Sequence, residues 1–154
     1  GRDASTPPFK LDKLFSLRSG VFVTIKLNGE PRGCWGTIEP RQPNVAREIV
    51  ENAVGAATSD TRRKPLGRHE LDRVTFYISI VGPLRQVGSI SELAPERYGL
   101  LVRNGSREGI LLPGEAKTAR WQLAECKRKA GLPQSARVQM HVFRTVVLEY
   151  NGIE

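Results

Sequence analysis

The chain has 154 residues, of which 39% are hydrophobic and 26% are charged. This length and composition predict a globular protein whose core is large enough to fold without disulfides. No apolar run approaches the roughly 18 residues that a membrane-spanning helix requires, and the two cysteines lack the spacing of a disulfide framework or a zinc site. We therefore expect a cytoplasmic protein without a membrane segment.

The net charge of +8 raises the question of nucleic-acid binding. Arginines account for 17 of the 24 basic residues and are scattered from Arg2 to Arg144, which is typical of a solvated surface. Only 6% of the residues are aromatic and could stack on bases, so the sequence disfavours a nucleic-acid partner. The basic loop at residues 62–68 nevertheless leaves RNA binding as a hypothesis, weaker than the enzyme and adaptor hypotheses given below.

Residues 1–19 are polar, contain two adjacent prolines and are predicted to form an N-terminal arm before a packed domain over residues 20–154. The alternation in VFVTIKL predicts a strand over residues 21–27. Asn28-Gly29 then predicts a hairpin turn, because both residues tolerate positive φ. The stretch PRGCWGTIEP, residues 31–40, is accordingly the returning strand of a hairpin.

The remaining pattern alternates helices and strands. A helix is predicted over residues 44–58 with Asn44 as its N-cap. Its packed stripe is expected to be Ala46, Ile49, Val50, Ala53, Val54 and Ala57, with Arg47, Glu48, Glu51 and Asn52 in solvent. A loop follows at 61–72, a strand at 73–80, a hairpin at 98–112, a helix at 115–130 and one long strand at 138–150. This order predicts an α+β fold with a mostly antiparallel sheet flanked by helices.

Few residues offer chemistry by pattern alone. His69 and His141 lack any metal-ligand spacing, and the chain contains neither a nucleophile elbow nor a phosphate-binding glycine loop. No metal site is therefore predicted, and the sequence identifies no cofactor. Cys126 lies on the apolar stripe of its predicted helix and is expected in the core.

Cys34 is the exception. In a strand, Arg32, Cys34 and Gly36 share one face, while Gly33 and Trp35 share the other. Glycine within a strand marks a bulge or a close approach, so Gly36 would leave the thiol without a bulky neighbour. Arg32 could then lower the thiol pKa and make Cys34 a nucleophile. Burial of a small thiol beneath helix 44–58 explains the same pattern equally well.

Five stretches in order, GVFVTIKLNGEPRGCWGTIEP, ENAVGAATSD, LDRVTFYISIVGPL, GILLP and KRKAGLP, resemble the AMMECR family, whose prokaryotic members are called protein A of the AmmeMemoRadiSam system. The family motif Leu-Arg-Gly-Cys-Ile-Gly stands here as residues 31–36, with Pro31 and Trp35 replacing its two apolar residues. A second signature, Asp-x-Arg-Phe-x-Pro-Leu, matches residues 60–66, where Arg63 replaces the aromatic residue.

The resemblance implies an α/β fold with a larger and a smaller part and a site around the Arg-Gly-Cys motif. Arg32, Cys34 and both glycines match the motif by position, and the family implies no settled activity. We assign candidate catalytic roles to Cys34 and Arg32 and candidate binding roles to Gly33, Trp35, Gly36, Asp60 and Arg62. The name of the prokaryotic system pairs this family with a Memo-type protein and a radical SAM protein. This association implies an accessory or enzymatic role in a modification or redox pathway, with these two proteins as partners. A protein-binding adaptor without catalysis remains the alternative. The family's usual N-terminal helical stretch is not recognisable, so a longer or fused parent protein is also expected.

Overall fold

The computed structural model describes residues 11–151, which fall into two compact units. The first unit draws on Gly1–Val81 and Val146–Glu154, and the second is Gly82–Thr145. Each unit has its own four-stranded sheet and its own apolar core. The predicted α+β class is confirmed, although two sheets replace the single sheet that the pattern suggested.

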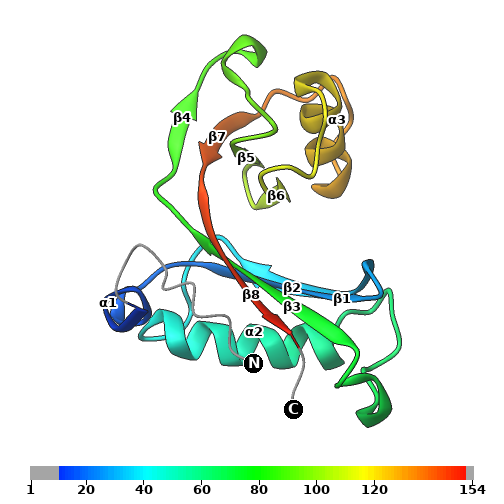
Figure 1. The fold of residues 1–154 in the computed structure, drawn as a ribbon. Helices are drawn as coiled ribbons and strands as arrows, with labels where there is room; N and C mark the ends of the chain where they lie inside the picture. Colours follow the sequence, from blue (N-terminus) through cyan, green and yellow to red (C-terminus); the bar gives the residue numbers. More distant parts are fainter. Residues whose placement is uncertain (1–10, 152–154) are drawn as a thin grey trace. The chain divides into compact units, whose positions relative to one another are not determined.

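The first unit holds the hairpin that carries the Arg-Gly-Cys motif. Its sheet has the order β2-β1-β3-β8, with β1 at Val21–Leu27, β2 at Glu30–Thr37, β3 at Val74–Val81 and β8 at Thr145–Asn151. Helix α2, Val45–Thr58, lies along one face of this sheet (Figure 1). The core between them consists of Val21, Val23, Ile25, Val45, Ala56, Val74 and Ile80.

A short helix, α1, spans Leu11–Ser16 within the predicted N-terminal arm. Leu14 and Phe15 of this helix are partly buried against the core of the first unit. The division into an arm and a packed domain stays a prediction, but apolar packing begins before residue 20.

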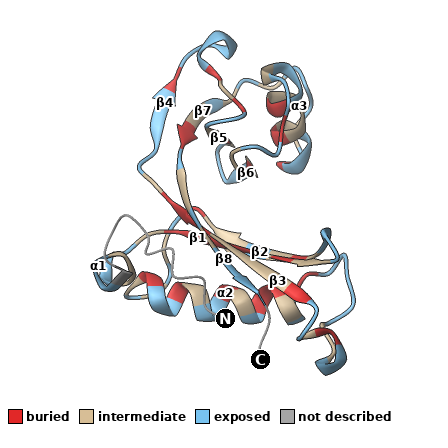
Figure 2. Cartoon of the chain, in the orientation of Figure 1, coloured by how far each residue is buried: buried red, intermediate tan, exposed pale blue. Residues whose placement is uncertain are grey.

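Helix α2 begins as predicted, but its buried face is shifted from the predicted one. The Asn44 side chain accepts a hydrogen bond from the Arg47 backbone N–H, so the predicted N-cap is confirmed. The predicted apolar stripe is only half right: Ile49, Ala53 and Ala57 pack against the core, whereas Val50 is 65% and Val54 58% exposed. Figure 2 shows the buried positions on the side of α2 that meets the sheet, and they are Val45, Glu48, Asn52, Gly55 and Ala56.

Glu48 and Asn52 turn inward because they form hydrogen bonds with backbone groups that need partners. The Glu48 carboxylate accepts hydrogen bonds from the backbone N–H groups of Arg41 and Gln42. The Asn52 amide donates to the Val21 carbonyl at 3.2 Å and to Glu48 at 3.3 Å. Buried backbone groups without partners are costly, so these contacts outweigh the burial of two valines.

The second unit is a sheet of order β4-β7-β5-β6 covered by helix α3. Its elements are β4 at Arg85–Val87, β5 at Gly99–Asn104, β6 at Arg107–Leu111, α3 at Ala119–Lys129 and β7 at Gln139–Phe143. The hairpin predicted around Asn104-Gly105 is present as β5 and β6. Cys126 is fully buried, as predicted, and burial raises its pKa to about 12.

The predicted long last strand is wrong. Residues 139–151 form two strands, β7 and β8, which belong to different sheets and part at Arg144. The Arg144 carbonyl accepts the Gly82 N–H at 2.8 Å, and its guanidinium lies 4.9 Å from the centre of the Tyr98 ring. Alternation alone cannot reveal such a change of sheet, because both strands keep the period of two.

One further prediction, the absence of a membrane segment, concerns the described part of the chain. Within residues 11–151, no helix is long and apolar enough to cross a membrane.

The basic run at residues 127–129 has structural partners: Lys127 donates to the Gln134 carbonyl, Lys129 to the Ile110 carbonyl, and Arg128 pairs with Glu125. These contacts account for the run without an external anion.

Candidate functional site

The Arg-Gly-Cys motif lies on β2, an edge strand of the first sheet, and contains a β-bulge. Gly33 pairs with Ile25, whereas Pro31 pairs with Lys26, so Arg32 is the extra residue of β2. A bulge bends the strand and re-aims a side chain. The regular alternation that would place Arg32 on the face of Cys34 is broken at this point.

Arg32 reaches a loop rather than the thiol. Its guanidinium donates to Glu70 through Nε at 2.9 Å and Nη2 at 3.0 Å, and to the carbonyls of Lys64 and Pro65 at 2.7 and 3.3 Å. The two charged side chains are only 17% and 12% exposed. Hydrogen bonds from Arg32 are the main cause that lowers the pKa of Glu70 to about 2. Arg32 thus fixes the loop of residues 60–70 along the edge of β2.

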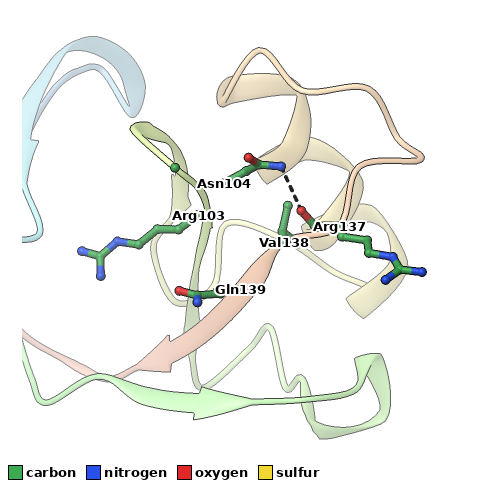
Figure 3. Close-up of a pocket in the computed structure, with 6 residues that line it drawn as sticks. Arg103, Asn104, Arg137, Val138 and Gln139 are labelled. Carbon is green, nitrogen blue, oxygen red and sulfur yellow. Dashed lines mark hydrogen bonds between the residues drawn. The ribbon is translucent and has the colours of Figure 1, made fainter.

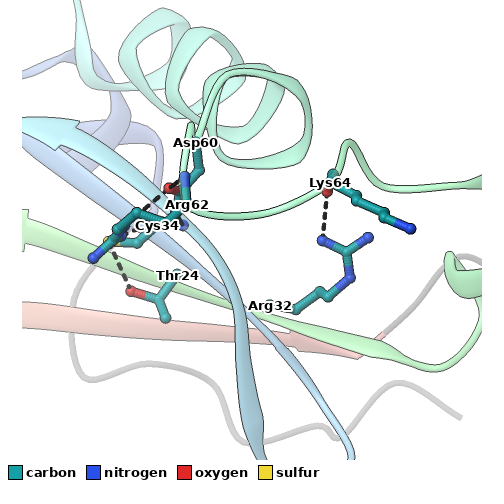
Figure 4. A network of polar contacts seen from close by, with 6 residues as sticks. All are labelled: Thr24, Arg32, Cys34, Asp60, Arg62 and Lys64. Carbon is teal, nitrogen blue, oxygen red and sulfur yellow. Dashed lines mark hydrogen bonds and ion pairs between the residues drawn. The ribbon is translucent and has the colours of Figure 1, made fainter.

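Asp60 fixes the other end of the same loop. Its carboxylate accepts the backbone N–H of Cys34 at 3.1 Å and is bound by the Arg62 side chain at 3.0 and 2.9 Å (Figure 4). The contact with Cys34 occupies a backbone donor on the outer edge of β2, where no neighbouring strand can accept it. Hydrogen bonds from Arg62 are the main cause that lowers the pKa of Asp60 to about 2.

The two sequence signatures therefore meet. Residues 32–36 of β2 and the loop of residues 60–70 lie against each other, and we call this surface the motif edge. Sequence reasoning missed Glu70, the partner of Arg32. One signal was available, because Glu70 is the only acidic residue between Asp60 and Asp72, in a loop that holds four basic residues.

The Cys34 thiol is half-buried, on the face of β2 opposite to Gly33 and Trp35, which meet α2, so the burial beneath helix 44–58 that the sequence allowed is wrong. Its Sγ lies 3.6 Å from Thr24 Oγ1, the hydroxyl of its cross-strand neighbour. Tyr77 is the next residue in the same row, and Lys26 Nζ lies 4.8 Å from its ring centre. A thiol, a hydroxyl and a phenol thus stand side by side across three strands.

The two glycines serve close packing. A Cβ on Gly33 would lie 2.2 Å from the Ala56 carbonyl oxygen, so Gly33 lets β2 approach α2. A Cβ on Gly36 would lie 2.4 Å from the Val21 carbonyl oxygen and 2.7 Å from Cδ1 of Phe22. The expectation of open space beside Cys34 is wrong, because Phe22 covers Gly36.

Trp35 lies against α2 and remains partly in solvent. A Cβ on Gly55 would come within 2.2 Å of Cδ1, 2.5 Å of Cγ and 2.6 Å of Nε1 of the indole. The five-membered ring therefore rests on the bare backbone of Gly55. With 43% of Trp35 exposed, the rest of the indole is accessible.

Other parts of the described chain are weaker candidates for a functional site than the motif edge. Among residues 11–151, no group of three or more His, Cys, Asp or Glu side chains could hold a metal ion. The second unit has a shallow pocket lined by residues 103–105 and 137–139. Its arginines, Arg103 and Arg137, point in opposite directions (Figure 3), and Arg103 is paired with Glu108 at 2.7 Å. The pocket therefore lacks converging groups.

Relatives of this chain occur in bacteria and archaea. A protein of Thermotoga maritima is 44% identical over 135 residues, covering 86% of this chain and 75% of that protein. A protein of Methanothermobacter thermautotrophicus is 36% identical, covering 82% of this chain and 70% of that protein. A protein of Clostridium acetobutylicum is 36% identical over 107 residues, which are only 23% of its own length.

The fold and the family agree. The crystal structure titled uncharacterized protein PH0010, from Pyrococcus horikoshii, superposes with a TM-score of 0.83 at 25% identity, covering 96% of this chain and 81% of that one. The family model named AMMECR1 matches residues 2–148, a span that includes both signatures and both units. The resemblance noted in the sequence is thereby confirmed, and the chain belongs to the AMMECR1 family.

Proposed function

We propose that this chain is an accessory component of a cytoplasmic modification or redox pathway, and that its motif edge binds the macromolecule on which partner enzymes act. A Memo-type protein and a radical SAM protein are the partners proposed from the family resemblance. The observation that carries the proposal is the use of Arg32: its guanidinium is bound by Glu70 and by two carbonyls of the loop. A cation that is meant to activate a thiol would be directed at the sulfur.

The motif edge instead has the properties of a preformed recognition surface. Its loop is held at both ends, by Asp60 and by Arg32, so little conformational entropy is lost on binding. Trp35 and Arg62 remain accessible, with Arg62 65% exposed. Tryptophan and arginine are the side chains most enriched at binding hot spots.

A second candidate is an enzyme that uses Cys34 as a nucleophile. The row formed by Cys34, Thr24 and Tyr77 favours it, because a neighbouring hydroxyl can position a thiol and relay a proton. In this alternative Cys34 is catalytic. In the accessory role, the thiol is needed only for its small volume.

Site-specific photocross-linking in the native cell separates the two. A photoreactive phenylalanine analogue at position 35 is expected to give a discrete cross-linked species. The same analogue at position 121 is the matched control, because Trp121 is similarly exposed at 49% but lies on α3. The species should persist when Cys34→Ser is added. Absence of a specific product at position 35, or its loss with Cys34→Ser, would overturn the accessory proposal.

A further inference from the structure

The indole of Trp35 forms a flat platform. Three atoms of its five-membered ring would lie within 2.6 Å of a Cβ on Gly55, so the ring lies on the helix backbone rather than standing on its edge. Any side chain at residue 55 would lift it. Trp35 is 43% exposed, and the contact with Gly55 occupies only one face of its ring. An aromatic ring supported from behind and open in front can accept another flat group by stacking.

Positive charge is fixed along the same edge of β2. The Asp60 carboxylate accepts the backbone N–H of Cys34, the residue before Trp35, and binds the side chain of Arg62. Farther along the edge, Arg32 holds the carbonyls of Lys64 and Pro65. Figure 4 shows Arg62 beside Cys34 and Lys64 beside Arg32, with their charged ends directed apart, and Arg63 between them in the chain is exposed.

Opposing charge is scarce within the motif edge. Residues 61–69 contain four basic and no acidic residues. The two flanking acids are already engaged, Asp60 with Arg62 and Glu70 with Arg32. Arg62 is balanced by Asp60, so an anionic ligand would meet the positive charge of the exposed Arg63, Lys64 and Arg68 in the loop beside β2, and release of its counterions would favour binding.

We infer that the motif edge binds a single-stranded nucleic acid, with one base stacked on Trp35 and the neighbouring phosphates contacted by Arg62, Arg63 and Lys64. This assignment rests on the proposed binding role and names the class of ligand. A partly exposed indole and several exposed cations on one strand edge are the two kinds of side chain by which single strands are bound without sequence preference. An acidic protein segment would match the charges but would leave the platform unexplained, and a duplex keeps its bases stacked inside.

The assignment corrects the reason for which the sequence disfavoured nucleic acid. The few aromatic residues and the scattered arginines are properties of the whole chain. A binding site needs only a local combination, and the fold brings one exposed tryptophan to the most basic loop of the first unit.

Fluorescence provides the test, because the chain contains only Trp35 and Trp121. In Trp121→Phe, Trp35 is the sole tryptophan, and base stacking quenches indole emission. We would titrate this variant with 12-nucleotide oligouridylate and oligothymidylate at 50 mM salt, and follow anisotropy of the labelled oligonucleotide in parallel. Saturable quenching with both probes is expected. The logarithm of the association constant should fall with the logarithm of salt at a slope of about −2, as for three phosphate contacts.

Two sets of variants locate the site. Trp35→Ala and Gly55→Ala should each lower the association constant on the order of tenfold, the former by removing the platform and the latter by lifting the ring. Arg63→Gln with Lys64→Gln should weaken binding and flatten the salt slope. Lys117→Gln with Arg120→Gln removes the same charge from exposed positions of the second unit and should leave both values unchanged.

Each adverse result has a defined meaning. Anisotropy and quenching that stay flat with both probes would overturn the assignment, as would binding that ignores Trp35→Ala. Equal competition by a polyglutamate peptide would replace the nucleic acid with an acidic protein segment. A cross-linked protein at position 35 together with failed titrations would retain the accessory role while removing the nucleic acid. Failure of both the cross-linking and the titrations would remove the motif edge as a binding surface.

Discussion

Gly33→Ala is expected to destabilise the first unit without touching the thiol. The new Cβ would lie 2.2 Å from the Ala56 carbonyl oxygen, about 1.2 Å short of an ordinary contact of 3.4 Å. Both partners are backbone, one in β2 and one in α2, so no side chain can rotate away. Overpacking of this kind typically costs about 1–3 kcal/mol, and the rigid geometry places Gly33→Ala near the upper end.

Thermal unfolding followed by circular dichroism measures this effect. For a chain of this size, about 3 kcal/mol corresponds to a fall in Tm of roughly 6–12 °C. Gly88→Ala is the matched control, because its Cβ would meet only Glu92 Oε2, at 3.9 Å, and we expect it to melt within about 2 °C of the parent chain. Ala56→Gly should not rescue Gly33→Ala, since the obstructing atom is the carbonyl oxygen rather than the Ala56 methyl.

The result bears on how the motif is understood. If the glycines existed to expose Cys34, Gly33→Ala would change thiol accessibility and leave Tm unaltered. A Tm within 2 °C of the parent chain would refute the close-packing explanation of Gly33. It would also mean that β2 and α2 can separate by about an ångström at no cost.

Three other predictions follow from buried or charged groups. Because the pKa of Asp60 is lowered from 3.8 to about 2, its stabilising contribution is complete above pH 4 and is lost as the pH falls through 2. In acid unfolding, the Asp60→Asn variant should therefore lose less stability than the parent chain between pH 4 and pH 2. Glu48→Ala should cost about 2 kcal/mol in urea unfolding, because two backbone N–H groups lose their acceptor, whereas the exposed Glu51→Ala should change stability by less than 0.5 kcal/mol. Iodoacetamide at pH 8 should label the half-buried Cys34 in the native chain, whereas Cys126 should be labelled only after unfolding, because its pKa is about 12. Mass spectrometry measures the labelling of each cysteine. Equal labelling of both cysteines in the native chain would contradict this prediction and remove the nucleophile alternative.

Local patterns predicted much of this protein. The hairpin around Asn28-Gly29 follows from backbone preferences, and Asn28 and Gly29 do have positive φ, at 51° and 80°. The N-cap at Asn44 and the strand at Val74–Val81 follow from capping chemistry and period-two alternation. The motif residues and the family were likewise evident from the order of short segments. These features depend on neighbours in the chain, which a sequence displays directly.

The tertiary structure decided how those parts are used. Whether residues 139–151 stay in one sheet, and whether Asn52 of α2 turns inward, depends on backbone groups far away in the sequence. The role of Arg32 changed for the same reason: a single bulge in β2 directs its guanidinium to Glu70, 38 residues later, rather than to the neighbouring thiol. Alternation predicts faces only while the register holds, so the motif was visible in the sequence but its contacts were not.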